Sequence, residues 1–174
     1  MGLYYEDLKI GDQLTTAART IGEYEISSFA GLTGDYNPVH TDSEYARSTP
    51  FGSIIAHGAL GFAIAVGLMN RTGTLDGTAL AFLGVRDWRF TAPILVGDTV
   101  HAELEVTELR ETRRPDAGIV TRTVALVNQR GETVQSGSLT IMIRRTADRG
   151  QAAAPRLPGQ IPPAAPPPTP GAPY

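Results

Sequence analysis

Residues 58–71 read GALGFAIAVGLMNR, an apolar stretch of helical length that has no polar face. A helix that is apolar on all sides is expected to be enclosed by protein rather than to lie on a surface. Its apolar part, Ala59 to Met69, is too short to cross a bilayer, which takes about 20 residues. We therefore expect a buried central helix, around which the rest of the fold is arranged.

The chain after this helix is predicted to form strands joined by short turns. The expected strands are Leu80–Thr91, Val100–Val106, Ile119–Asn128 and Thr133–Arg144. In the second of them apolar residues alternate with polar ones, as in a strand with one wet face. Long strands joined by short turns imply an antiparallel sheet. One apolar helix and one curved antiparallel sheet wrapped around it is the hotdog arrangement, a single domain of the α+β class.

The chain before the helix is expected to contain one strand and two short helices. The strand covers Gln13–Ile21, and the capping-box spacing of Thr20 and Glu23 predicts a helix after it. That helix would bury four apolar residues at helical spacing: Ile26, Phe29, Ala30 and Leu32. Thr33–Pro38 is dense in turn-forming residues and is expected to be a loop. A second short helix is predicted over Asp42–Arg47.

Composition excludes several classes of function. The formal net charge is -3 and there is no basic stripe, so nucleic acid is not an expected partner. The chain has no cysteine, which excludes disulfides, thiolate metal sites and a cysteine nucleophile. Met1 to Asp12 does not resemble a signal peptide, and we expect a cytoplasmic protein that does not enter the membrane.

The composition changes near Asp148. Residues 151–174 hold nine of the thirteen prolines, mixed with Ala and Gly. Such a segment has little apolar surface to bury and cannot donate a regular ladder of hydrogen bonds. We therefore expect a folded domain over residues 1–147 and a disordered Pro/Ala-rich tail over residues 148–174. The alternative for the tail is a docking peptide for a proline-reading domain.

The segment GDYNPVH, residues 34–40, holds the first candidates for chemistry. Pro38 disfavours a helical conformation at Asn37, so Asp35 and His40 do not share a helix face. They meet only if the loop folds back, which Gly34 and an Asx turn at Asp35 or Asn37 would permit. The alternative is that Asp35 and Asn37 merely satisfy backbone groups in a turn.

Gly58 is the first residue of the predicted central helix. The first N–H groups of a helix have no internal partner and carry the positive end of its dipole. A glycine there lets a carbonyl oxygen approach closely, as stabilisation of an enolate requires. The alternative is that Gly58 only relieves crowding.

An Asp/His pair with an oxyanion donor suits the addition of water to an α,β-unsaturated thioester, which requires no metal.

Three segments, in this order, resemble the MaoC-like dehydratases and (R)-specific enoyl-CoA hydratases. They are FAGLTGDYNPVH at residues 29–40 followed by Ala46, IAHG at residues 55–58, and FTAPILVGDT at residues 90–99. The resemblance covers Leu3 to Arg145. It implies that Asp35 and His40 hold and activate a water molecule, and that the Gly58 N–H faces the thioester carbonyl.

The same resemblance gives His57 and Asn37 supporting roles. His57 would shape the turn into the helix, and Asn37 would hold the catalytic loop and help to orient the water. It also implies a homodimer, no cofactor, and an acyl thioester substrate, most simply a CoA ester, interconverted with its (3R)-3-hydroxyacyl form. Val66 is a departure, because some relatives have serine at that position.

Two other functions remain open from sequence. A hotdog thioesterase would share the fold and the oxyanion donor, and a non-catalytic acyl-binding subunit would share the fold alone. The length of the acyl chain is also open, and so is the carrier of the thioester, CoA or acyl carrier protein. The residues that form either the core or a tunnel wall are Leu60, Phe62, Ile64, Val66 and Leu68.

Overall fold

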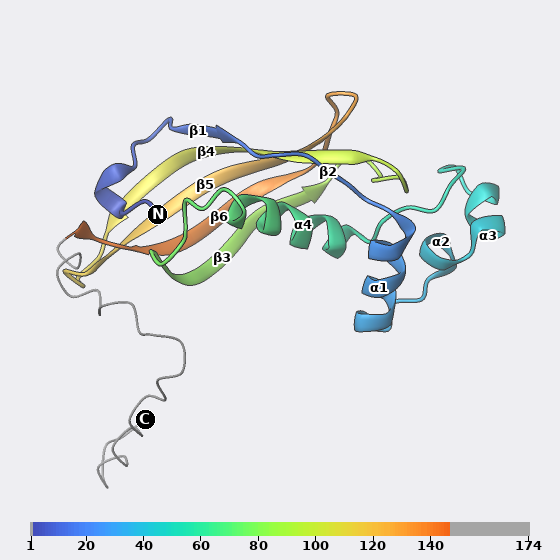
Figure 1. The fold of residues 1–174 in the computed structure, drawn as a ribbon, viewed down its shortest axis with the longest axis horizontal. Helices are drawn as coiled ribbons and strands as arrows, with labels where there is room; N and C mark the ends of the chain where they lie inside the picture. Colours follow the sequence, from blue (N-terminus) through green and yellow to red (C-terminus); the bar gives the residue numbers. More distant parts are fainter. Residues whose placement is uncertain (1, 147–174) are drawn as a thin grey trace, which may run out of the picture.

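The computed structural model describes residues 2–146, and its dominant element is one antiparallel sheet (Figure 1). The four long strands are β3 (Ala79–Phe90), β4 (Thr99–Glu111), β5 (Ala117–Asn128) and β6 (Thr133–Arg144). Two short strands, β1 (Gln13–Thr15) and β2 (Arg19–Thr20), both pair with β4. The sheet order is β1-β4-β5-β6-β3, so β3 lies at an edge although it comes first among the long strands.

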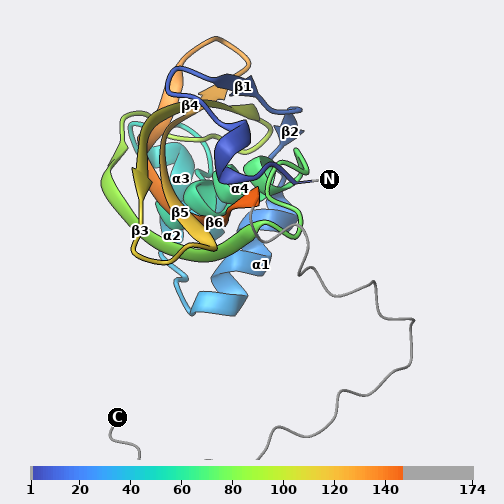
Figure 2. The same cartoon turned by 90° about the vertical axis from the view of Figure 1, so that its left-hand side faces the viewer.

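Helix α4 (Gly58–Asn70) lies against the inner face of the curved sheet, as the view along the sheet shows (Figure 2). Val100, Ala102, Leu104 and Val106 of β4 are all buried and face the helix side. The intervening residues of β4 form the wetter outer face. The prediction of a curved antiparallel sheet wrapped around an apolar helix, in the α+β class, is therefore confirmed.

The prediction that this helix is enclosed on all sides is wrong for the single chain. Ala59, Ala63 and Gly67 are exposed, and they follow one another at a spacing of four residues. The opposite side of α4 is buried by Ile64, Ala65 and other residues. A stripe of small apolar residues on α4 is therefore exposed to solvent in the single chain. The sequence pattern does not distinguish this exposed apolar face from a buried one.

The prediction of one strand over Gln13–Ile21 is also wrong, because the ladder breaks after Thr15. Thr16 is buried, and its hydroxyl accepts a hydrogen bond from the Ala102 N–H at 2.9 Å. The Thr16 N–H donates to the Ala102 carbonyl, also at 2.9 Å. A side chain has taken the place of a backbone acceptor, so pairing stops and resumes at β2. A 3₁₀ turn, η1 (Tyr5–Asp7), precedes these strands.

Helix α1 (Glu23–Thr33) forms where expected but starts differently. The Gly22 N–H donates to the Glu25 side chain at 3.0 Å, so the predicted pair of Thr20 and Glu23 does not cap the helix. The Thr20 hydroxyl instead meets that of Thr99, at 2.8 Å. Of the four residues predicted to be buried, Ile26 and Ala30 are buried and Phe29 is partly buried, but Leu32 is 83% exposed.

The chain from α1 to α4 forms two further short helices. Helix α2 (Pro38–Thr41) begins at the last residue of the predicted loop and was not expected. Helix α3 (Ser43–Ser48) confirms the prediction over Asp42–Arg47, and the Asp42 side chain caps it by accepting from Glu44 and Tyr45. Figure 1 shows α1, α2 and α3 gathered at one end of the molecule, beyond the N-terminal end of α4.

Within residues 2–146 no helix has the length and apolar character needed to cross a membrane. The predicted tail, residues 148–174, lies outside the described residues.

Candidate active site

The loop that carries Asp35 begins where α1 ends. Gly34 caps α1 with a φ of 78°, in the left-handed region that glycine adopts without steric strain. The Asp35 N–H then donates to the Thr33 hydroxyl, and the Asp35 side chain accepts from the Asn37 N–H, both at 3.3 Å. The Asx turn thus forms at Asp35, and it leaves the second carboxylate oxygen available.

Asn37 makes the next turn of the same loop. Its side chain accepts from the Val39 N–H at 3.3 Å and caps α2, with Pro38 at the first helical position. His40 follows on this single turn of helix. Both Asx turns considered from sequence are therefore present, and together they fold the loop back on itself.

His40 is oriented by a backbone carbonyl. Its Nδ1 lies 2.8 Å from the carbonyl oxygen of Ile55, the residue that leads into α4. Because a carbonyl only accepts hydrogen bonds, Nδ1 carries the hydrogen of the neutral ring. The lone pair is then on Nε2, the atom available to accept a proton.

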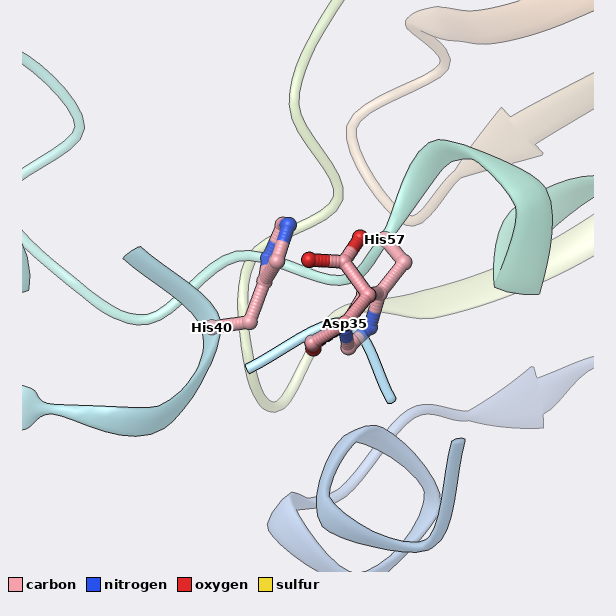
Figure 3. Close-up of side chains that lie close together, drawn as sticks. All are labelled: Asp35, His40 and His57. Atoms are coloured by element: carbon pink, nitrogen blue, oxygen red, sulfur yellow. Dashed lines mark hydrogen bonds between the residues drawn. The ribbon is translucent and has the colours of Figure 1, made fainter. Parts of the chain in front are cut away.

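His57 joins the catalytic loop to the start of α4. It is buried, and its Nε2 donates to the Asp35 carbonyl at 2.9 Å. Its ring stacks on that of His40, with centroids 3.9 Å apart. The side chains of Asp35, His40 and His57 therefore lie close together (Figure 3). A carboxylate oxygen of Asp35 and one ring nitrogen of each histidine all lie within 4.8 Å of one another. Their spacing in the sequence did not indicate this grouping.

Gly58 is the first residue of α4, where the backbone N–H has no intrahelical partner. A β-carbon at this position would lie 2.9 Å from Cε1 of Phe90, closer than real contacts allow. The residue therefore cannot carry a side chain unless Phe90 moves. A hollow of about 300 Å³, lined in part by Phe51 and Pro93, adjoins Gly58.

A buried amide holds the first turn of α4 against the sheet. The Gln135 side chain, on β6, donates to the Gly58 carbonyl at 3.1 Å and accepts from the Trp88 indole N–H, also at 3.1 Å. Gly61 makes room for it, since a β-carbon there would lie 2.1 Å from the Gln135 nitrogen. The role of Gln135 was not predicted from the sequence. Its signal is a polar residue in the series that includes Leu139 and Ile141, on the core-facing side of β6.

The third motif segment, residues 90–99, has a structural role around Asp98. This buried carboxylate accepts hydrogen bonds from the Leu95 N–H and from the side chains of Gln129 and Arg130. Burial opposes ionisation, but these bonds hold the pKa of Asp98 below its usual value. The turn fixed in this way pairs with the chain before α4, where the Ala56 N–H donates to the Ile94 carbonyl at 2.8 Å.

The residues proposed as core or tunnel wall divide into two groups. Leu60, Ile64 and Leu68 are buried in the core. Phe62 and Val66 line a hollow of about 590 Å³ between α4 and β3. Gly58, Phe62 and Val66 follow at i, i+4 and i+8, so they share one face of α4.

The chain matches the model of the MaoC like domain over residues 7–128. It is 39% identical over 143 residues to an (R)-specific enoyl-CoA hydratase of Rhodospirillum rubrum, a match that covers 80% of this chain and 91% of that protein. It is 34% identical over 138 residues to the (R)-specific enoyl-CoA hydratase of Aeromonas caviae, covering 79% of this chain and 97% of the relative.

Solved structures give the same relationship. A MaoC-like dehydratase from Rhodospirillum rubrum superposes with a TM-score of 0.70 at 32% identity, covering 83% of this chain and 98% of that one. A monoamine oxidase regulatory protein from Archaeoglobus superposes with a TM-score of 0.77 at 38% identity, covering 83% of this chain and 96% of that one. The chain belongs to the MaoC-like dehydratase family, as the three sequence segments predicted.

Proposed function

We propose that the protein adds water to trans-2-enoyl-CoA thioesters and removes it from the (3R)-3-hydroxyacyl products, as a carbon–oxygen lyase. The observation that carries the proposal is the bond between His40 Nδ1 and the Ile55 carbonyl. This bond leaves the basic Nε2 atom of His40 available, and a ring nitrogen of His40 lies within 4.8 Å of the Asp35 carboxylate, at the N-terminal end of the helix that begins with Gly58. The names of the relatives, (R)-specific enoyl-CoA hydratase and 3-hydroxybutyryl-CoA dehydratase, support the same chemistry.

In the proposed mechanism, the water molecule donates one hydrogen bond to the Asp35 carboxylate and one to Nε2 of His40. The oxygen of the water forms a bond to C3 of the enoyl group. The π electrons of the C2–C3 double bond shift toward the thioester carbonyl, which gives an enolate. One proton of the water leaves through this pair, and one proton is delivered to C2. Water and enoyl thioester are thereby converted into the 3-hydroxyacyl thioester with atoms and charge in balance.

The thioester oxygen gains negative charge during this step. The N–H of Gly58, at the positive end of α4, is the donor that we assign to it. The Gln135 amide, which accepts from the Trp88 indole N–H, donates to the Gly58 carbonyl and so positions this first turn of the helix before the substrate binds.

The direct test is an assay with crotonyl-CoA. We expect the absorbance of the conjugated thioester to fall without release of free CoA thiol, and the product to be (3R)-3-hydroxybutyryl-CoA. Thiol release at the rate of absorbance loss would instead indicate a thioesterase. Saturable binding of crotonyl-CoA without turnover would indicate an acyl-binding subunit.

The hollow lined by Phe62 and Val66 is the place that we assign to the acyl chain, because it continues the face of α4 that starts at Gly58. We expect Val66→Phe to lower kcat/KM for a C8 enoyl-CoA at least ~10-fold more than for crotonyl-CoA, since each buried methylene contributes about 0.8 kcal/mol. The control is Ala63→Phe, at an exposed position that lines the same hollow. This variant should discriminate less between the two chain lengths than Val66→Phe does. Equal loss for both chain lengths in Val66→Phe would contradict this assignment.

We propose that catalysis needs no metal or other cofactor, although Asp35, His40 and His57 bring three possible ligands together. Asp35 and His40 must bind the water and move its proton, and a metal held by the same atoms would compete with that role. We expect kcat to be unchanged after dialysis against EDTA, and no added metal ion should raise it. Loss of activity with EDTA and recovery with one metal ion would contradict it.

We further propose that the protein is a homodimer or an even multiple of it. Strand β3 is an open edge of the sheet, and Phe82, Leu83 and Val85 on it are between 42% and 48% exposed. An edge with this much apolar surface is expected to be covered by another subunit.

Light scattering is expected to give at least twice the chain mass of 18.5 kDa. Leu83→Lys should shift the protein toward the monomer, whereas Ile10→Lys, at another exposed apolar position, should not. A monomer mass for the unmodified chain at working concentrations would count against the proposal.

A further inference from the structure

Arg122 is an unusual residue on the inner face of the sheet, away from the proposed active site. Arg122 is in the middle of β5, in register with Val106 of β4 and Leu139 of β6, which are both buried. Its own exposure is only 4%. The neighbours two residues away on the same strand, Val120 and Val124, are each 1% exposed. An arginine therefore occupies a position where the pattern of the strand favours an aliphatic residue.

The guanidinium of Arg122 has no ionic partner within residues 2–146. Its Nε atom is buried without a hydrogen-bond acceptor. Asp12 is the acidic residue whose charge acts on it, but the two form no ion pair, and the Asp12 carboxylate accepts from the Lys9 N–H at 2.7 Å. Burial accordingly lowers the pKa of Arg122, and Asp12 offsets this only in part. A buried charge without a partner destabilises the fold, unless a ligand supplies the missing group.

A cavity of about 240 Å³ adjoins this guanidinium. Its apolar walls are Leu3, Leu8, Leu14, Leu104 and Val106. Asp12 and Gln13 also line it and are exposed, so the cavity reaches the surface beside them. Liquid water occupies roughly 30 Å³ per molecule, and a ligand with about six to eight non-hydrogen atoms would therefore fill the space.

We propose that this cavity binds a short aliphatic carboxylate of about four to six carbons, with the carboxylate on Arg122 and the chain against the leucines. A guanidinium presents two parallel N–H groups that match the two oxygens of a carboxylate. The walls offer a short alkyl chain an apolar surface, and a polar or highly charged ligand would leave them unmatched.

This site is separate from the one that holds Asp35 and His40. The cavity is also lined by Thr74, four residues after α4 ends, whereas the catalytic loop meets the first residues of α4. Thirteen residues of helix span about 20 Å. The ligand would lie between the N-terminal segment, through Leu3, Leu8 and Leu14, and strand β4. Its binding should therefore tie that segment to the sheet and raise stability without occupying the substrate site.

Thermal unfolding of the full chain tests the proposal. We expect sodium butanoate at about ten times its Kd to raise Tm by about 3 °C. Sodium chloride at the same sodium concentration and butanamide, which is uncharged but has the same shape, should not raise it. Arg122→Met removes the charge at similar volume and should abolish the shift, whereas His40→Gln should retain it.

Two further measurements keep the test decisive if Arg122→Met does not fold. Leu14→Phe fills the cavity with Arg122 in place and should also abolish the shift. In a sample labelled with ¹⁵N-arginine, butanoate should move the Nε–H resonance of Arg122. No Tm shift with the unmodified chain, an equal shift with sodium sulfate, or a shift that persists in Arg122→Met would overturn the proposal.

Discussion

Asp35→Asn and His40→Gln are each expected to lower kcat for crotonyl-CoA hydration by at least ~10²-fold, the lower end for loss of a general acid–base group. The amide introduced by Asp35→Asn retains an oxygen that can accept from the Asn37 N–H, so the turn should survive while the charge is lost. Because both residues act on one water in one step, the double variant should be little worse than either single one. The measurement is kcat for crotonyl-CoA hydration by each purified variant, together with a melting curve that shows whether the variant is folded.

His57→Gln is the matched control for this pair. His57 is buried beside the two residues and donates to the Asp35 carbonyl, but in the proposed mechanism it does not touch the water. We expect His57→Gln to lower Tm, and to lower kcat much less than Asp35→Asn or His40→Gln does. Turnover near that of the unmodified chain in both Asp35→Asn and His40→Gln, with the fold intact, would refute the assignment of the catalytic pair.

Gly58→Ala is expected to lower kcat/KM for crotonyl-CoA by about 10²-fold, similar to the loss of one oxyanion donor. The N–H remains, but the added methyl group occupies the space through which the thioester oxygen must approach. The control is Gly67→Ala on the same helix, where a β-carbon meets nothing within 4 Å. That variant should keep its activity and gain slightly in stability, because alanine favours helix more than glycine does.

The contact between position 58 and Phe90 gives a second explanation that can be separated from the first. A β-carbon at Gly58 would press on the Phe90 ring, so Gly58→Ala could act only by displacing that ring. If it did, the additional change Phe90→Ala would restore activity. We expect no such recovery, since in the proposed mechanism the added methyl group itself hinders the approach of the thioester oxygen to the N–H. Recovery to near the original rate would assign glycine a packing role only.

The large elements of the fold were predictable because their patterns are long. Helix α4 is thirteen residues long and almost wholly apolar, and each long strand has twelve or thirteen residues. The failures are single-residue events. The Thr16 hydroxyl replaces a backbone acceptor, and Glu25 rather than Glu23 caps α1. Leu32 is at a helical spacing that suits burial, yet it is 83% exposed.

The site was predictable only as far as one loop and one helix start. Asp35, His40 and Gly58 were found from turn chemistry, helix termini and a resemblance to known enzymes, and their proposed roles are still predictions. The contacts that orient them, from the Ile55 carbonyl and the Gln135 amide, depend on which strands lie next to each other. The sequence does carry one neglected signal. Both Gln135 and Arg122 are polar residues on the core-facing side of a strand.

The position of β3 at the sheet edge has a consequence for the order in which the chain can fold. Among the described residues β3 pairs only with β6, the last strand to be synthesised, and β1 pairs with β4, whose residue Glu105 lies 92 positions after Gln13. Helix α4 precedes every long strand of the sheet that covers it. Contacts between such distant segments slow folding and leave apolar segments open in the meantime. A nascent chain must therefore carry α4 uncovered until β4 and β5 emerge, and β3 unpaired until β6 emerges. During that interval the exposed apolar segments make the chain most prone to aggregation.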